Sequence, residues 1–153
     1  MRFTIVAVGR VRDAALAQAI AEYERRAARY WPLDSVEVRE GGGGSRPPAE
    51  ARSREGEALL RRAAGSVLVV CDEHGQQLTS QEFSAAMQRW REDGRDVAFI
   101  LGGAHGLAPD VLQRAAHQLA LARWTLPHDL ARLVLAEQLY RAGSIVRGEP
   151  YHK

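Results

Sequence analysis

Short apolar runs alternate with amphipathic segments along the whole chain, and this alternation limits the possible folds more than any other feature. Runs rich in Val, Ile, Leu or Phe are typical of strands buried in a sheet. Such runs occupy Phe3 to Gly9, Ser66 to Cys71, Asp96 to Leu101 and Leu119 to Ala122. A fifth segment, Ser35 to Arg39, alternates in the way expected of a half-exposed strand.

Each predicted strand is followed by a helical pattern with its own start signal. Asp13 is a candidate N-cap, Thr79 and Glu82 fit a capping box, and prolines stand where the other helices begin. The predicted helices run behind Asp13 to Tyr30, from Pro48 to Ala64, from Thr79 to Trp90, from Pro109 to His117, and from Pro127 to Val146. Because strand and helix alternate throughout, the sequence predicts an α/β fold with a parallel sheet and helices on both faces. With 153 residues and 46% hydrophobic content, we expect one domain, residues 1–153.

The carboxyl ends of parallel strands meet at one edge of the sheet, where functional loops gather. Four segments are expected there: Gly9 to Arg12, Cys71 to Gly75, Gly102 to Gly106 and Arg123 to His128. The GGAHG loop, residues 102–106, matches neither the dinucleotide nor the phosphate-loop pattern. A loop that binds a ligand through its backbone and a tight turn without a ligand are equally compatible with it.

Composition excludes several classes of protein. Cys71 is the single cysteine, and the histidines form no ligand pair, so neither a disulfide framework nor a metal site is expected. No apolar run approaches the roughly 20 residues of a membrane helix, and we expect a cytoplasmic protein with no membrane partner. The net charge of +2, with arginines interleaved among acidic residues, permits a nucleic-acid partner without arguing for one. The GGGGSRPP segment, residues 41–48, is predicted to be a surface loop.

Individual residues allow a structural and a functional interpretation. His117 falls in the last turn of a predicted helix and is assigned a structural role, and His128 is expected to shape the start of the last helix. Cys71 is expected to be a small apolar core residue and not a nucleophile. The last helix is apolar around most of its circumference, so it is either a central core helix or part of a homodimer interface.

The most specific motifs lie in the C-terminal half. They are Gly102-Gly103 with Gly106-Leu107, Thr125-Leu126-Pro127-His128, Glu137 to Ala142 (EQLYRA) and Arg147 to Lys153 (RGEPYHK). Together with the opening Val6 to Gly9 and the central Gly94 to Val97, they resemble the RlmH family of SPOUT methyltransferases over essentially the whole chain.

The resemblance implies a SPOUT-type α/β fold with a C-terminal trefoil knot, a homodimer, and S-adenosylmethionine as cofactor. It further implies methylation of N3 of a pseudouridine in 23S ribosomal RNA of the large subunit, on the assembled ribosome and not on DNA. Periodicity alone predicts no knot, since general topology rules favour an unknotted chain. A shaped ribosomal surface suits a chain of modest charge.

By the same resemblance, the cofactor site comprises one strand end, two glycines and the following loop. These residues are Cys71, Gly102, Gly103, Leu121, Ala122, Arg123, Trp124, Thr125, Leu126 and Pro127. The apolar side chains of Leu121 and Leu126 are expected to pack against the adenine. Main-chain groups are expected to form hydrogen bonds with its polar edge. The Trp124 ring either attracts the sulfonium or simply packs.

The C-terminal tail carries the residues expected to meet the substrate. We expect His152 to orient the target base or accept its proton, Tyr151 to stack or hydrogen bond, and Arg141 to favour an anionic base. Arg147 and Lys153 are the expected phosphate contacts. The tail alternatively docks on the ribosome or completes the partner's site. The chain departs from the common family pattern at Cys71 and His105.

Three other functions stay open from the sequence. A non-catalytic ribosome-associated factor with the same fold would bind the cofactor without transferring the methyl group. A flavodoxin-like protein would bind flavin or phosphate, although no phosphate-loop lysine is present. Another SPOUT specificity, such as a transfer-RNA position, would change only the substrate.

Overall fold

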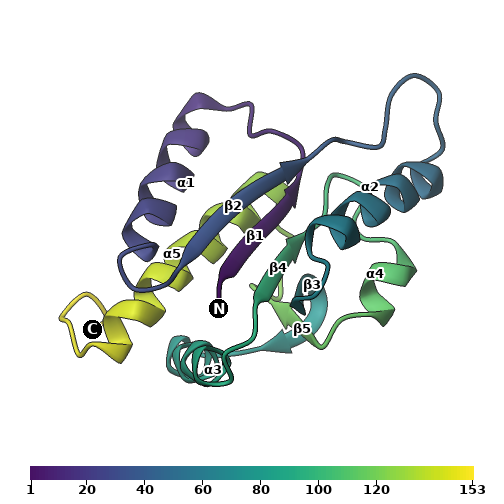
Figure 1. Ribbon diagram of the computed structural model, residues 1–153. Helices are drawn as coiled ribbons and strands as arrows, with labels where there is room; N and C mark the ends of the chain where they lie inside the picture. The colour runs from purple at the N-terminus through teal and green to yellow at the C-terminus, as the bar shows by residue number, and fades with distance from the viewer.

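The computed structural model describes residues 1–153, and it confirms the predicted alternation of strands and helices. Five strands alternate with five helices (Figure 1). The elements are β1 (Phe3–Val8), α1 (Ala14–Ala27), β2 (Leu33–Val38), α2 (Pro48–Arg62), β3 (Val67–Gln77), α3 (Ser80–Glu92), β4 (Val97–Leu101), α4 (Pro109–Gln113), β5 (His117–Ala120) and α5 (His128–Val146).

The predicted helix starts form as the local sequence requires. Asp13 caps α1 by accepting a hydrogen bond from the Leu16 amide at 2.9 Å, and Thr79 and Glu82 form both halves of the capping box of α3. Proline occupies the first turn of α2 and α4, where its missing N–H costs no hydrogen bond. Helix boundaries in this chain are therefore set largely by local chemistry.

All five strands belong to one parallel sheet in the order β2-β1-β4-β3-β5. Phe3 at the start of β1 pairs with Leu33 on one side and Val97 on the other, so the three strands begin in register. Every strand therefore ends at the same edge of the sheet. β4, buried at all five positions, lies in the centre of the sheet.

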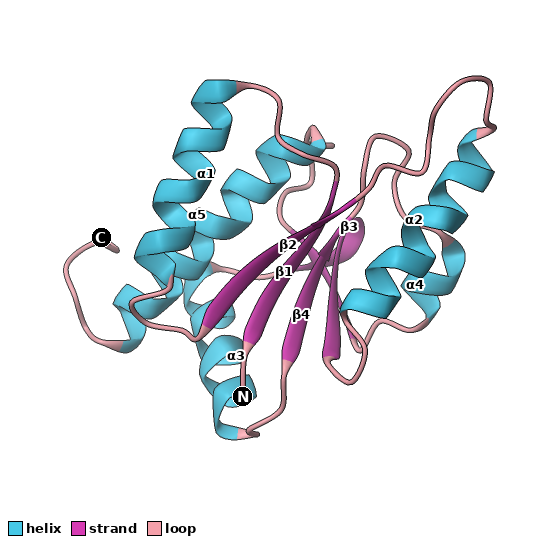
Figure 2. Ribbon diagram, turned by 45° about the horizontal axis from the view of Figure 1, so that its top comes forward, coloured by secondary structure: helices cyan, strands magenta, loops and turns pink.

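Helices cover both faces of the sheet, as predicted (Figure 2). On one face, α1, α3 and α5 pack over a core that includes Phe3, Trp31 and Phe99, where the Phe3 ring meets Trp31 edge-on at 5.6 Å. On the other face, α2 and α4 cover a smaller core around Val6, Val70 and Ile100. No helix is long and apolar enough to cross a membrane.

Helix α5 is a core helix along its sheet-facing side. The Trp31 indole donates to the Leu139 carbonyl at 2.9 Å, and the buried guanidinium of Arg132 pairs with Glu24 at 3.1 Å and Glu37 at 2.8 Å. These carboxylates raise the pKa of Arg132 against the opposing effect of burial. The prediction that α5 is a core helix is correct for the side that faces the sheet. The alternative prediction, a homodimer interface, concerns the outward side of the helix.

Two boundaries differ from the sequence prediction. His117 does not end a helix: α4 stops at Gln113, and the exposed His117 opens β5 with its ring 5.3 Å from that of Trp90. The Ala116 amide donates to the Leu68 carbonyl at 2.9 Å, so pairing with β3 overrides the helical pattern. β3 also continues past Cys71 to Gln77, with a shift in register between Cys71 and Gln76 where it pairs with β5.

We expect Leu139→Ala to lower the free energy of unfolding by about 2–5 kcal/mol, because it empties a fully buried site between α5 and the sheet. Leu139→Met keeps the volume and should cost less than about 1.5 kcal/mol. Urea denaturation followed by circular dichroism measures both changes. Equal losses in the two variants would contradict a tightly packed core at this position.

Candidate active site

A cavity of about 670 Å³ lies at the carboxyl edge of the sheet. Its wall comes from three places in the chain: the middle of β3, the glycine-rich loop after β4, and the loop that leads from β5 into α5. The lining residues are Cys71 to Glu73, Leu101 to Ala104, Gly106, Leu107, Leu121, Ala122, Trp124 to His128 and Ala131. Three of the four segments predicted at this edge meet here. The fourth, Gly9 to Arg12, lines a separate groove at the ends of β1 and β2.

The glycines of the 102–106 loop are required by close packing within the chain. A Cβ on Gly103 would lie 2.8 Å from Val8 Cγ1, and a Cβ on Gly102 would lie 2.9 Å from Leu107 Cγ. Gly106 adopts a φ of +76°, which side-chain-bearing residues rarely adopt. These contacts bring the loop close to β1 and leave its backbone facing the cavity.

Behind the glycine-rich loop lies Glu55 of α2, a residue that the sequence reasoning missed. Its side chain is 4% exposed, and Oε1 accepts a hydrogen bond from the Gly41 amide at 3.0 Å. Oε2 is buried without a partner, 3.4 Å from the position that a Cβ on Gly103 would take. Glu55 thus links the loop after β2 to the cavity wall, and no local pattern in α2 signals this.

The loop from Leu121 to Pro127 is tied to β3 by side chains and keeps its own amides free. Thr125 Oγ1 donates to Glu73 Oε2 at 2.5 Å, and Arg123 Nε donates to Gln77 Oε1 at 2.8 Å. None of the backbone N–H groups of residues 121–126 donates a hydrogen bond to another backbone or side-chain group. Leu121 and Leu126 are half-buried in the wall, whereas the Trp124 side chain is 84% exposed. The packing interpretation of Trp124 is therefore wrong for this chain by itself.

Acidic side chains gather at the mouth of the cavity beside β3. Asp72 and Glu73 both line it, and Asp72 accepts hydrogen bonds from the amide and the ring of His74. Sequence reasoning placed this segment at the functional edge without assigning either carboxylate to the site. Their position directly after a buried strand was the signal that could have done so.

Cys71 lines the cavity but does not end the strand as predicted, because β3 continues to Gln77. Burial raises the pKa of its thiol to about 12, because the thiolate would be poorly solvated there. The thiol is therefore protonated at neutral pH and unsuited to nucleophilic attack. This agrees with its assignment as a small apolar residue.

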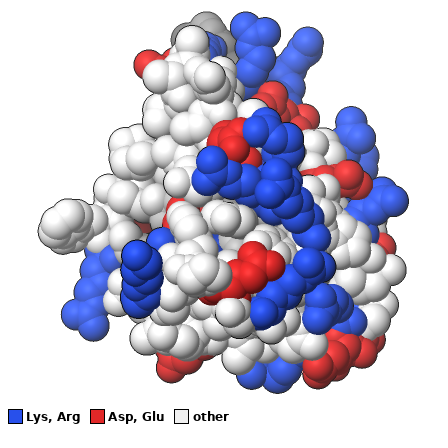
Figure 3. All heavy atoms as spheres, turned by 90° about the vertical axis from the view of Figure 1, so that its left-hand side faces the viewer, with Lys and Arg blue, Asp and Glu red and all other residues white.

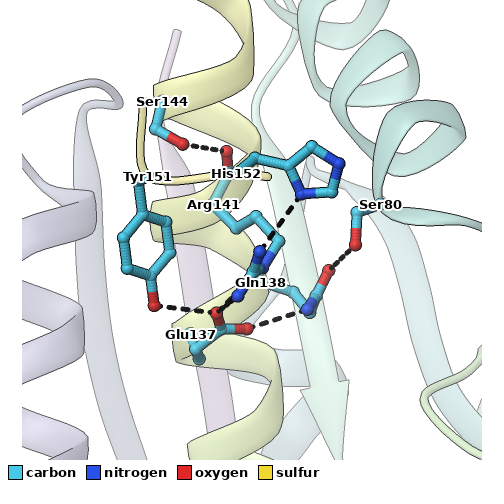
Figure 4. A network of polar contacts seen from close by, with 7 residues as sticks. All are labelled: Ser80, Glu137, Gln138, Arg141, Ser144, Tyr151 and His152. Carbon is cyan, nitrogen blue, oxygen red and sulfur yellow. Dashed lines mark hydrogen bonds and ion pairs between the residues drawn. The ribbon is translucent and has the colours of Figure 1, made fainter. Parts of the chain in front are cut away.

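The C-terminal tail folds back onto α5 through a polar network (Figure 4). Glu137 Oε1 accepts hydrogen bonds from Arg141 Nη2 at 2.7 Å and from the Tyr151 hydroxyl at 3.0 Å. The Arg141 guanidinium also lies over the Tyr151 ring, 4.8 Å from its centre. Burial, with hydrogen bonding to Tyr23 and Glu137, raises the pKa of Tyr151, so this hydroxyl stays protonated. The structure thus brings the three predicted catalytic residues, Arg141, Tyr151 and His152, together.

The contacts of His152 determine which ring nitrogen carries its proton. Arg141 Nη1 lies 3.1 Å from His152 Nδ1, and since a guanidinium only donates, Nδ1 must accept. A neutral ring then carries its proton on Nε2, and this N–H can donate to Gln81, 2.9 Å away, when the side-chain amide of Gln81 turns its oxygen toward the ring. In this arrangement Nε2–H of His152 is a hydrogen-bond donor, and the lone pair of Nδ1 accepts from Arg141.

Within one chain, the tail and the cavity are well separated. Arg141 stands 13 residues beyond His128 on α5, about 20 Å along the helix at 1.5 Å per residue. None of Arg141, Arg147, Tyr151, His152 and Lys153 lines the cavity. Of the ten predicted cofactor residues, all but Arg123 do. The predicted site therefore forms two clusters, one at each end of α5.

His128 lines the cavity and pairs with Asp129 at 3.3 Å, whereas His105 is exposed on the glycine-rich loop. No group of three or more His, Cys, Asp or Glu side chains is arranged to hold a metal ion.

Comparison with solved structures defines the class of fold. The chain aligns over its whole length with 75% of the tRNA (m1G37) methyltransferase from Aquifex aeolicus, with a TM-score of 0.56 and 13% identity. It aligns over 99% of its length with 70% of a probable methylase family protein from Haemophilus influenzae, with a TM-score of 0.54 and 12% identity. A family model described as "Predicted SPOUT methyltransferase" matches residues 1–152. The chain belongs to the SPOUT methyltransferase family, whose members use S-adenosylmethionine.

Relatives that match over the full length identify the group within this family to which the chain belongs. The chain is 53% identical over 154 aligned residues to ribosomal RNA large subunit methyltransferase H of Gemmatimonas aurantiaca, with complete coverage of both proteins. It is 50% identical, again with complete coverage, to the protein of the same name from Anaeromyxobacter dehalogenans. The predicted resemblance to the RlmH family is confirmed.

We expect the Cys71 thiol of the native protein to react with Ellman's reagent at pH 8 far more slowly than in denaturant. With a pKa of about 12, roughly one thiol in ten thousand is ionised at that pH. The rate should rise as pH increases toward 12, because the thiolate is the reactive form. Native and denatured rates that agree within a few-fold would contradict the burial of this group.

Proposed function

We propose that this protein transfers a methyl group from S-adenosylmethionine to N3 of a pseudouridine in 23S ribosomal RNA, acting on the assembled ribosome. The observation that carries the proposal is the full-length likeness to ribosomal RNA large subunit methyltransferases H at about half identity. The cavity at the predicted cofactor residues supports it. We place the reaction in the cytoplasm and assign it to a single domain, residues 1–153.

The cavity has the size and chemistry that the cofactor requires. Its volume of about 670 Å³ lies within the range of sites for drug-sized ligands. The free backbone N–H groups of residues 121–126 are available to the polar edge of an adenine, and Leu121 and Leu126 to its faces. Asp72 and Glu73 at the mouth complement the positive charges of an ammonium and a sulfonium group. These residues would hold S-adenosylmethionine, which supplies an electrophilic methyl carbon.

The residues of the chain have two tasks in the transfer: to present N3 in line with that carbon, and to remove the N3 proton as the N–C bond forms. Positive charge from Arg141, Arg147 and Lys153 favours the anionic base that remains when the proton leaves. His152 orients the base through Nε2–H when the base takes the place of Gln81 at that nitrogen, since Arg141 occupies the other ring nitrogen. The half-buried wall limits water at the reacting centre.

A homodimer would bring the two clusters of the site together, one from each chain. One chain carries them about 20 Å apart along α5, so its own tail does not reach its own cavity in this arrangement. The outward side of α5 and the loop before it expose Trp124 at 84%, Leu130 at 36% and Val146 at 37%, as an interface helix would. Two antiparallel α5 helices would bring each tail to the partner's cavity. We also propose the C-terminal trefoil knot implied by the family, formed as the chain passes from α4 on one face to α5 on the other.

The composite site is tested by mixing two inactive variants, Gly103→Val, which fills the cavity wall, and His152→Ala, which alters the tail. Subunit exchange places one intact cavity beside one intact tail, so activity should return in the mixture. Neither parent should show activity when incubated with itself. An inactive mixture in which heterodimers are demonstrated by native mass spectrometry would contradict the shared site.

Gly103→Ala should weaken cofactor binding, because its Cβ would lie 2.8 Å from Val8 Cγ1 and displace the loop. Gly103→Ala combined with Val8→Ala removes that atom, leaving the next contact at 3.3 Å, and should recover part of the affinity. Isothermal titration calorimetry measures both, with Val8→Ala alone as the control. No recovery in the double variant would show that the glycine serves another purpose.

Replacing His152 with Ala should lower kcat by about 10²–10⁴-fold and leave the Kd for S-adenosylmethionine within a few-fold of the unmodified protein. The reason is that His152 lies outside the cavity wall, and its proposed contact is with the target base and not with the cofactor. Equal losses in turnover and cofactor affinity would rule out this role.

The function itself is tested with labelled methyl donor and three substrates: assembled ribosomes, isolated large subunits and naked ribosomal RNA. We expect label on a pseudouridine, with assembled ribosomes the preferred substrate. Cofactor binding without transfer to any of the three would instead support a non-catalytic ribosome-associated factor.

A further inference from the structure

The groove at the ends of β1 and β2 lies on the same edge of the sheet as the cavity and has no role in the function described above. Its lining residues, here called the arginine groove, are Gly9, Arg10, Arg12, Glu37, Val38, Arg39 and Glu40. We propose that the arginine groove binds the phosphodiester backbone of the RNA strand on one side of the methylated nucleotide. The proposal rests on the proposed function, since it assigns a contact to the same substrate.

The first argument is position. β4, whose end contributes Leu101 to the cavity wall, is the direct neighbour of β1, and β1 is the neighbour of β2. Adjacent strands lie about 4.8 Å apart, so the ends of β1 and β2 lie roughly 5 and 10 Å from that of β4. Consecutive phosphates of an RNA strand are separated by a similar distance. An RNA strand that places its base at the cavity is therefore long enough, within two nucleotides, to lay its phosphates over this groove.

The second argument is charge. Three arginines and two glutamates line the groove, but Glu37 is held by the buried Arg132 of α5 at 2.8 Å. Glu40 lies 3.7 Å from Arg12, an ion pair in which both side chains are largely exposed. Arg10 and Arg39 are exposed and have no acidic partner or hydrogen bond within the chain. The groove thus offers two free guanidinium groups, which suit bidentate contacts with phosphate.

A second basic face of the molecule differs from the arginine groove because its arginines have acidic partners nearby. Lys and Arg side chains gather over α1 and the end of α5, with acidic side chains among them (Figure 3). Arg25 and Arg26 both pair with Glu22. These two arginines are largely neutralised by that local partner, so the α1 side of this face is less suitable for RNA than the arginine groove.

The third argument is that the groove is built by a specific backbone. Gly9 turns the chain out of β1 with a φ of +80°, and a Cβ there would lie 2.7 Å from Glu40 Oε1. Its amide donates to the Val38 carbonyl at 2.8 Å, which fixes the two strand ends against each other. Arg10 and Arg39 thus follow directly after the ends of two adjacent strands that are fixed against each other.

The test compares the double variant Arg10→Gln/Arg39→Gln with Arg61→Gln/Arg62→Gln. The control pair removes the same charge from exposed positions at the end of α2, which leads to the opposite edge of the sheet. Affinity for assembled ribosomes is measured by sedimentation at several salt concentrations, and affinity for naked large-subunit RNA by filter binding. Thermal unfolding and calorimetry with S-adenosylmethionine verify that fold and cofactor site are intact.

We expect the groove variant to bind both RNA substrates roughly tenfold more weakly, with a salt slope reduced by about 2, and the control to bind as the unmodified protein does. Equal losses in both pairs, or an unchanged salt slope, would overturn the proposal. Weaker binding to ribosomes with unchanged binding to naked RNA would assign the groove to a ribosomal protein and also overturn it. Methyl transfer by the unmodified protein is scored separately, so failure of the proposed function leaves the binding comparison intact.

Discussion

The parallel arrangement of five strands buried between two helical layers is the constraint on which the other features depend. Because every connection crosses over a face of the sheet, all strands point the same way and all loops that follow them meet at one edge. Segments separated by more than fifty residues, such as Glu73 and Thr125, are in hydrogen-bonding contact there. The cavity is a consequence of this topology, and its wall needs no unusual residue beyond the glycines.

Close packing then gives the edge its shape. Gly103 lies against Val8, and Gly75 lies where a Cβ would approach the Gln118 carbonyl carbon to 2.6 Å. The first contact draws the glycine-rich loop toward β1, and the second lets the irregular part of β3 lie beside β5. Glycine in these positions serves intramolecular packing, and the exposed backbone that results is what a cofactor would use. The structural and functional interpretations of the GGAHG loop are therefore complementary.

The two ends of α5 differ in the charge of the side chains around them. Near its start, Asp72 and Glu73 line the cavity and give it an acidic border, which would suit a cationic cofactor. Near its end, Arg141 and Arg147 lie over tyrosine rings and the tail ends in Lys153, which suits an anionic substrate. Glu137 is the link within the second cluster, since it fixes both Arg141 and Tyr151. A tail that would otherwise fray is thereby held in one conformation.

The sequence by itself determined the strands, the helices and their capped starts, because apolar periodicity and caps such as Asp13 and Thr79 act within a few residues. Its motifs also identified the family and nine residues of the cavity wall. Only the tertiary structure decided that His117 starts a strand, since pairing with β3 is a long-range interaction that a helical pattern does not report. The same holds for the buried carboxylate of Glu55, the acidic border of the cavity and the distance between tail and cavity. Each of these arises from residues far apart in the chain, and their proximity is set by the packing of the sheet and its helices.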